Sequence, residues 1–365
     1  MSRQSRFWSK NPNATAVIAL GALVLLIGYV EIAQPFGLTF ADLTGGLVTL
    51  DTMIRIAIFT IILVGLNLLM GYAGQISLGQ AAFYGIGAYV SAILTTLSFR
   101  QHVLQGISVT WWWPWLAMVL AMLVTGLFAY IMGRPILRLR GNYLAMATLG
   151  LGIVMYIVFR EGGDLTGGND GIGSIPRLAI GGFEIWPMER YYFLVWVLAL
   201  AVIILALNIV NSRIGRALRA IHSSEIAANT MGVDTDRYKL QILTVSAMMA
   251  SLAGSLYAHY QMVIAPSPFD FNSSVELVVM AAVGGLASIW GAPFGVAVVL
   301  ILQEILRNFS GAGFELVAFG FILVAIMIFM PEGLTVGGIN AYRHWRAVRA
   351  RRKEIEDSVE ILGAQ

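Results

Sequence analysis

The chain has 365 residues, of which 58% are hydrophobic and only 12% are charged, and its mean hydropathy is +0.78. A soluble domain carries about 25% charged residues, so this composition excludes an ordinary soluble protein and indicates one that crosses a membrane several times. The net charge of +3 does not indicate nucleic-acid binding, because the basic residues lie in short tracts between apolar runs, where such residues set topology. The absence of cysteine excludes disulfides and thiolate chemistry.

The apolar runs predict an all-α polytopic membrane protein. A helix needs roughly 20 mostly apolar residues to span a bilayer, and the chain offers about ten such runs, or about eight if some merge or re-enter. Glycine and proline near residues 284 to 293 predict broken or re-entrant helices there. The predicted spans are residues 14–33, 53–70, 76–97, 114–133, 142–159, 191–210, 240–262, 275–290, 292–309 and 313–331.

Charge distribution predicts the domain organisation and the orientation. Residues 1–335 form a single transmembrane domain, and residues 336–365 form a charged tail. When the N-terminus is placed in the cytoplasm, most of the 23 lysines and arginines fall in cytoplasmic segments, as the positive-inside rule requires. Both termini are then cytoplasmic, residues 160–190 form an outward loop, and residues 211–239 form a long cytoplasmic loop.

The outward loop contains a dense set of turn-forming residues. Its stretch from Leu165 to Gly173 holds four glycines together with Asn169 and Asp170, which favour tight turns. We expect a compact cover over the outward face, with a plain surface loop as the alternative.

The stretch from Gly71 to Tyr89 lies between two apolar runs and contains five glycines. Glycine in a helix interior costs about 1 kcal/mol relative to alanine, so this stretch cannot be one simple helix. Two explanations remain open, close helix packing or a backbone that opens around a solute. Small residues at four-residue spacing favour packing for most of it: Ser77, Ala81 and Gly85 on one face, and Gly87, Ser91 and Thr95 on another.

Helix packing does not explain Gln75 and Gln80, whose amides must find partners at membrane depth or face water. With Ser77 they are candidates for the polar lining of a solute path. A second glycine-rich stretch at residues 283–295 faintly matches the first, as expected for two discontinuous segments around a central pathway. The candidate pathway or packing residues are Gly74, Gln75, Ser77, Gly79, Gln80, Gly284 and Gly285.

The cytoplasmic segment shows helical spacing of apolar residues. We expect Ser223 to cap a short helix through Glu225 and Ala228, and Gly232 to end it in the left-handed conformation. Such a helix suits insertion into a groove of a partner protein, or, alternatively, adsorption on lipid headgroups beside its arginines. The residues of this candidate coupling site are Arg216, Arg219, Glu225, Ala227, Ala228 and Gly232.

No catalytic or metal site is predicted. The four histidines lie in different segments, and no nucleophile or ligand motif joins them. None of the three lysines, Lys10, Lys239 and Lys353, follows a glycine, as a phosphate-binding loop would require. The chain is therefore not expected to be an enzyme or to bind ATP or another cofactor itself.

Ionisable residues within membrane spans are often functional. Asp51 and Arg55 are four residues apart and could pair on one helix face. Glu276 and Glu304 are the least easily explained by structure, and they keep open an ion-coupled secondary transporter as an alternative function. The remaining ionisable residues near the span ends are Glu31 and Arg307.

Five motifs follow one another in the chain, namely Gly71–Gln80, Arg140–Gly150, Leu165–Ile172, Ser212–Gly232 and Gly284–Pro293. In this order, and over residues 50–335, the sequence resembles the LivM-type permease subunits of ATP-binding-cassette (ABC) importers for branched-chain amino acids. Similar permeases serve urea, short amides and aromatic acids, although the Gln75–Gln80 motif is more similar to the amino-acid branch. The family more often has an acidic residue where this chain has Asn229, and often where it has Ile153.

The resemblance implies a set of partners. The segment from Glu225 to Gly232 would be the coupling helix that contacts an ATP-binding subunit. A second permease of the LivH type, two ATP-binding subunits that hold ATP and magnesium, and an external solute-binding protein would complete the importer. The complex would lie in a bacterial or archaeal cytoplasmic (inner) membrane, surrounded by lipid.

Overall fold

The computed structural model describes residues 12–33, 46, 48–96, 112–139, 141–181, 183–286 and 288–309, together with 320, 321, 324, 328 and 333. The charged tail and most of the predicted span 313–331 lie outside these residues. The larger helices are α2 (Pro12–Ala33), α4 (Leu50–Leu66), α5 (Gln80–Thr95), α7 (Trp113–Ile136), α8 (Asn142–Glu161), α9 (Met188–Asn211), α10 (Arg213–Ser223), α12 (Thr235–Gln261), α13 (Phe271–Gly284) and α14 (Gly291–Phe309). The shorter elements are α11 (Glu225–Thr230), a π-helical turn η2 (Asn67–Tyr72), the turns η3 (Gly163–Leu165) and η4 (Ser267–Phe269), and strands β1 (Ala179–Ile180) and β2 (Phe183–Glu184).

Six helical segments in the described part of the chain are long and apolar enough to cross a membrane: α2, α4 with η2, α7, α8, α9 and α12. They confirm the prediction of a helical, polytopic membrane protein. Two further predicted spans correspond to shorter helices, since α5 has 16 residues and α13 has 14. A total of eight to ten crossings therefore stays a prediction.

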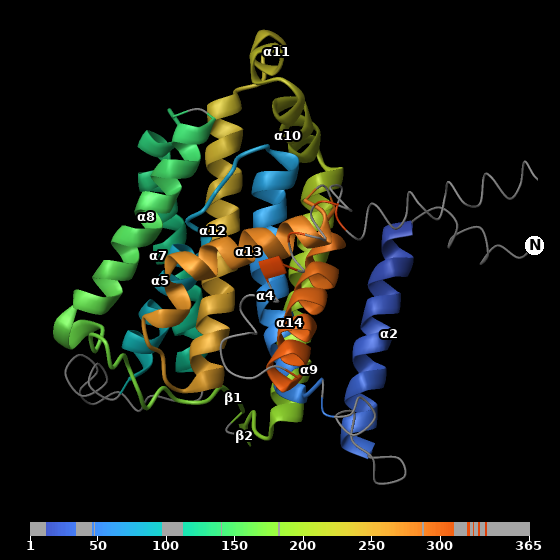
Figure 1. Cartoon of the computed structure of the whole chain (residues 1–365), viewed down its shortest axis with the longest axis vertical. Helices are drawn as coiled ribbons and strands as arrows, with labels where there is room; N and C mark the ends of the chain where they lie inside the picture. Colours follow the sequence, from blue (N-terminus) through green and yellow to red (C-terminus); the bar gives the residue numbers. More distant parts are fainter. Residues whose placement is uncertain are drawn as a thin grey trace, which may run out of the picture.

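Helix α12 lies at the centre and packs against α4, α5 and α7 (Figure 1). Small residues on α12 and α5 allow a very close crossing. A methyl group on Gly87 of α5 would lie 2.3 Å from the carbonyl oxygen of Ser251, and one on Gly254 of α12 would lie 2.0 Å from that of Tyr84. No larger residue fits at either position, so the predicted packing role of the Gly87 face is confirmed.

Two predicted span boundaries are wrong because hydropathy does not detect the hydrogen bonds and backbone conformations that set the helix ends. The span predicted at residues 76–97 begins only at Gln80, after the non-helical residues 73–79. The span predicted at residues 275–290 begins earlier and ends sooner. Asp270 caps α13 by accepting a hydrogen bond from the Ser273 amide at 2.8 Å, and Gly285, with φ of +99°, ends it.

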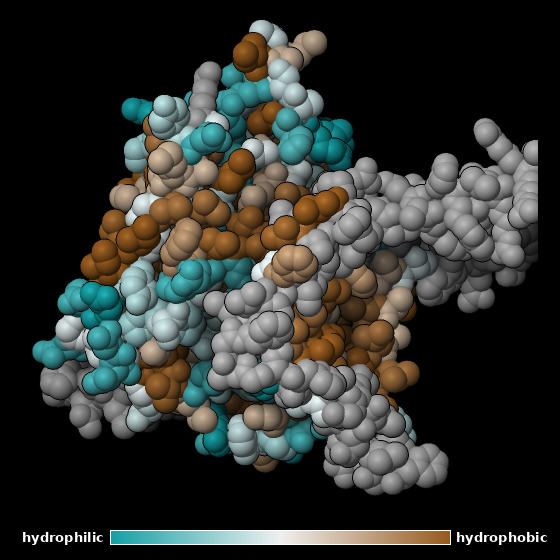
Figure 2. Space-filling model, in the orientation of Figure 1, coloured by the Kyte–Doolittle hydropathy of each residue, from teal (hydrophilic) through white to brown (hydrophobic). Residues whose placement is uncertain are grey.

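The two predicted loops lie at opposite ends of the molecule. Helix α11 projects from one end of the long axis and the β1–β2 hairpin lies at the other (Figure 1). The loop after α8 is compact, because Ile172 forms an antiparallel bridge with Ile264 beyond the end of α12. A hydrophobic band crosses the visible face between hydrophilic groups at the two ends (Figure 2), as expected for a protein embedded in a bilayer.

Candidate functional site

Residues 73–79 are not helical and pass between several helices. Side chains of these helices accept hydrogen bonds from backbone amides in and just after the segment. The amide of Leu78 donates to the hydroxyl of Thr148 on α8 at 3.0 Å, and the amide of Ala81 donates to Ser274 on α13 at 3.2 Å. A methyl group on Gly79 would lie 2.5 Å from the Thr148 carbonyl oxygen. The broken backbone is thus supported inside protein, as non-helical structure at membrane depth must be.

The segment begins beside α10. Gly74 has φ of +68°, and a methyl group on it would lie 2.9 Å from Nδ1 of His222. Beyond it burial alternates: Gln75 and Ser77 are buried, while Ile76 between them is 47% exposed.

Three polar side chains of this segment are buried with unused hydrogen-bonding groups. Gln75, Ser77 and Gln80 are 4%, 2% and 0% exposed. The Gln80 Nε2 donates to Oγ of Ser246 on α12 at 3.1 Å. Its Oε1, the Ser77 hydroxyl and both amide atoms of Gln75 have no hydrogen-bond partner among the residues that the structure describes. Leaving such a group unpaired costs about 1–3 kcal/mol, so these residues are the most polar buried part of the segment.

The predicted residues Gly284 and Gly285 are not part of this polar segment. Gly284 packs on the first turns of α14, where a methyl group would lie 2.0 Å from the Gly291 carbonyl oxygen. An indirect link joins the second glycine-rich stretch to the first. Asn67, at the start of η2, donates from Nδ2 to the carbonyl oxygen of Ser288 at 2.9 Å. The second glycine stretch therefore has a packing role in this structure and supports the end of α4.

The candidate coupling site consists of two helices rather than one. Helix α10 buries Leu218 and Ile221 and exposes Arg216 and Arg219. The cap of α11 is Ser224, whose hydroxyl accepts from the Ala227 amide at 3.3 Å. The prediction of Ser223 as the cap is wrong, because Ser223 still belongs to α10 and its hydroxyl donates to the Ala220 carbonyl oxygen. Gly232, with φ of +82°, follows α11 as predicted.

The residues of α11 divide between an inner and an outer face. Ala228 is buried, and Glu225 forms an ion pair with Lys239 of α12 at 2.6 Å. Ile226 is 74% exposed and Met231 86% exposed, and Ala227 is exposed beside them. A partner protein at this end would therefore meet Ile226, Ala227 and Met231 rather than Glu225 or Ala228.

Residues 48–331 match the family described as "Branched-chain amino acid transport system / permease component". The chain belongs to this family. It is 31% identical to the high-affinity branched-chain amino acid transport system permease protein LivM of Salmonella typhimurium, over 84% of this chain and 72% of that protein. It is also 31% identical to LivM of Escherichia coli K12, over 78% of this chain and 69% of that protein, and 25% identical to LivH of the same strain, over 76% and 90%. No solved structure matches.

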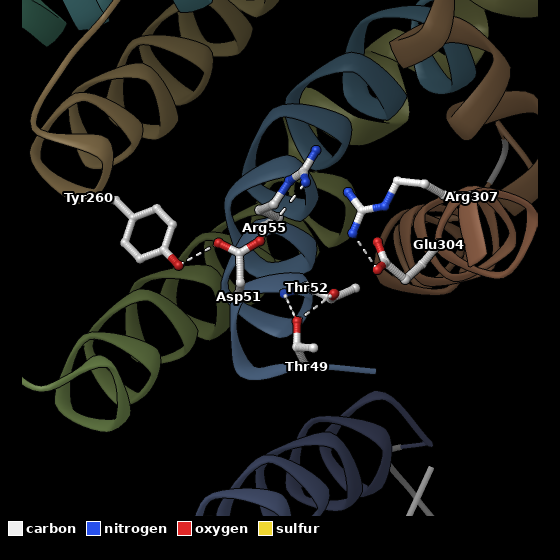
Figure 3. A network of polar contacts seen from close by, with 7 residues as sticks. All are labelled: Thr49, Asp51, Thr52, Arg55, Tyr260, Glu304 and Arg307. Carbon is white, nitrogen blue, oxygen red and sulfur yellow. Dashed lines mark hydrogen bonds and ion pairs between the residues drawn. The ribbon is translucent and has the colours of Figure 1, made fainter. Parts of the chain in front are cut away.

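In this permease the ionisable residues of the predicted spans have partners within the chain. Asp51 and Arg55 form the predicted pair at 3.9 Å, and the Tyr260 hydroxyl donates to Asp51 at 2.5 Å (Figure 3). Arg307 pairs with Glu304 on α14 at 2.5 Å. In addition, Gln303 donates to Glu276 at 2.6 Å. Each of these five residues therefore has a polar partner within the described part of the chain.

Sequence reasoning missed other buried polar groups of the permease, on α5 and η2. Tyr84 and Tyr89 are buried, and within the described part of the chain their hydroxyl groups and Oδ1 of Asn67 have no hydrogen-bond partner. The two tyrosine rings lie against Phe269 and Phe159, at centroid distances of 5.0 Å and 4.6 Å. Helical spacing could have found Tyr84, because it lies four residues after Gln80 and so on the same face of α5.

Proposed function

We propose that this permease forms half of the translocation pathway of an ABC importer for branched-chain or related hydrophobic amino acids. The observation that carries the proposal is the 31% identity to two proteins named as LivM permeases, over 84% and 78% of the chain. The second half would be a LivH-type permease. Two ATP-binding subunits would hold ATP and magnesium, and an external solute-binding protein would deliver the solute.

The orientation follows from charge. The arginines of α10 and the end that carries α11 would face the cytoplasm, together with both chain termini, and the β1–β2 hairpin would face outward. The ATP-binding subunit would then meet the exposed side of α10 and α11. Of the predicted coupling residues, Arg216, Arg219 and Ala227 would touch it, with Ile226 and Met231. Glu225, Ala228 and Gly232 would shape α11 from within.

The solute path would follow the broken segment. Gln75, Ser77 and Gln80 provide amide and hydroxyl groups that lack partners in the structure, and Gly74 and Gly79 let the backbone approach α10 and α8. These groups would hydrogen-bond a passing solute weakly. ATP-driven rocking of helix groups would expose the path to one side of the membrane at a time.

Reconstitution tests the proposal. The permease with its second permease and ATP-binding subunits is placed in proteoliposomes, with the solute-binding protein outside, and uptake of radiolabelled leucine is followed. We expect uptake that requires ATP inside the vesicles and that unlabelled isoleucine and valine compete away. Competition by urea, short amides or aromatic acids, with none by branched-chain amino acids, would reassign the solute class.

The same preparation tests the alternative of a secondary transporter. The permease alone is reconstituted with a proton or sodium gradient and no ATP-binding subunits. We expect no uptake above that of protein-free vesicles. Robust gradient-driven uptake that is lost in Glu276→Gln or Glu304→Gln variants would contradict the importer function.

A further inference from the structure

Lys239 is the one lysine that the structure describes, and it is 8% exposed. A lysine is almost never buried unless it is paired. Its partner is Glu225, whose carboxylate lies 2.6 Å from the Lys239 ammonium nitrogen, and the two side chains are 10% and 28% exposed. Removing one member would leave the other charge buried and uncompensated. The pair is thus a firm contact, unlike an exposed surface ion pair.

The pair joins two elements that have little else between them. Glu225 is the first residue of α11, and Lys239 lies in the second turn of α12. One further contact crosses the same gap, a 3.3 Å hydrogen bond from the Thr235 hydroxyl to Asn229. A helix of six residues is not stable by itself, so α11 takes its position from α10 and from these contacts with α12.

Helix α12 continues from the ion pair through the whole molecule. Its 27 residues extend for about 40 Å at 1.5 Å per residue. Along the way Ser246 contacts Gln80 of the broken segment, and Gly254 locks against α5. At the opposite end Tyr260 bonds to Asp51 of α4 (Figure 3). A displacement of the first turns of α12 would therefore reach both the candidate solute path and the opposite end of the bundle.

We propose that the Lys239–Glu225 ion pair is the strut through which movement of α11 is passed to α12. Both are positioning residues: they hold α11 and α12 as one body and do not themselves bind the ATP-binding subunit. This inference rests on the proposed importer function. It differs from the sequence-based expectation that Glu225 contacts the partner, because the Glu225 carboxylate is already engaged within the permease.

The test compares single, swapped and control variants in the complete reconstituted complex. Lys239→Met and Glu225→Gln break the pair, the double variant Glu225→Lys with Lys239→Glu restores it with reversed charges, and Arg237→Gln removes an exposed positive charge nearby. ATP hydrolysis and leucine uptake are measured on the same vesicles. We expect each single variant to lower the uptake per ATP hydrolysed to roughly one tenth of the wild-type value, because α11 then moves without displacing α12. The double variant should recover most of the lost uptake per ATP hydrolysed, and Arg237→Gln should have the same uptake per ATP hydrolysed as the wild type.

Two outcomes would overturn the proposal. One is an unchanged ratio of uptake to hydrolysis in Lys239→Met. The other is loss of ATP-binding-subunit copurification in Glu225→Gln but not in Lys239→Met, which would place Glu225 at the partner interface. The wild-type complex is measured first, and absence of ATP-dependent uptake there would refute the importer function rather than the strut.

A cross-linking experiment covers variants that fail to fold. The chain has no cysteine, so Glu225→Cys and Lys239→Cys can be combined and joined by a short, reducible bis-thiosulfonate reagent. If α11 and α12 move as one body, the cross-link replaces the ion pair and raises uptake above that of the unlinked double variant. Uptake that the cross-link abolishes and a reductant restores would show that the two helices must move apart, and would overturn the strut.

Discussion

Gln75 is buried with both atoms of its primary amide unpartnered, an arrangement that weakens the folded state. Replacing an unpaired buried polar group with an apolar one of similar size can stabilise a protein. If Gln75 binds the passing solute, its replacement by an apolar residue should therefore increase the stability of the protein and decrease transport.

We expect Gln75→Leu to raise the unfolding free energy of the detergent-solubilised permease by about 1–3 kcal/mol, and with it the melting temperature. We also expect it to lower leucine uptake. Fluorescence-monitored unfolding and vesicle uptake measure the two effects. Gln80→Leu is the matched comparison, because it also loses the hydrogen bonds to Ser246 and should not be stabilising. A stabilised Gln75→Leu variant with normal uptake would remove Gln75 from the path.

The cap of α11 illustrates the limit of sequence reasoning at this scale. Adjacent serines at 223 and 224 are equally good caps by residue type. The choice depends on backbone dihedrals, since Ser224 is extended while Ser223 is still helical. Similarly, no spacing rule predicts that Glu225 pairs with Lys239, because the rotation of a six-residue helix is set by its neighbours.

Ser224→Ala should loosen α11, since loss of an N-cap costs about 1 kcal/mol, and it should lower the uptake per ATP hydrolysed. Ser223→Ala removes the same hydroxyl one residue earlier and should have little effect. Parallel assays of ATP hydrolysis and uptake compare the two. Equal effects of both substitutions would contradict the assignment of the cap.

At the scale of elements, the crossing of α5 and α12 depends on glycine in a way that a single methyl group can test. Gly87→Ala would place a carbon 2.3 Å from a backbone oxygen, whereas Gly150 of α8 has open space within 4 Å. We expect Gly87→Ala to destabilise the permease by about 1–3 kcal/mol. Gly150→Ala should be neutral or gain up to about 1 kcal/mol through helix propensity. Thermal unfolding in detergent decides, and equal stability of both variants would contradict the close crossing.

The sequence predicts that the helix is broken before α5, but it does not predict the residue at which α5 begins. Five glycines and two glutamines made a continuous helix from Gly71 to Tyr89 untenable. The start at Gln80 depends on hydroxyl groups of Thr148 and Ser274, which lie far away in sequence. Hydropathy counts apolar residues and cannot detect such long-range hydrogen bonds. The span predicted from hydropathy therefore begins at residue 76, four residues before α5 begins.

At the scale of the whole molecule, the hydrophobic runs correctly predicted a polytopic helical protein, and six long apolar helices confirm it. The orientation remains a prediction that the lack of cysteine makes simple to test. Phe183→Cys in the β hairpin, where Phe183 is 79% exposed, should react with an impermeant maleimide on intact cells. Ile226→Cys should react only after permeabilisation. The reverse pattern would invert the topology.

The crossing of Gly87 with Gly254 also acts as a seal. Two backbones this close leave no room between them for water, lipid or an amino acid, so no solute can pass between α5 and α12 at this crossing. The broken segment and the start of α5 lie beyond this crossing and contact α8 and α13 as well as α12. There, the hydroxyls of Thr148 and Ser274 bind the backbone amides of Leu78 and Ala81, and such bonds can be exchanged for water when helices separate.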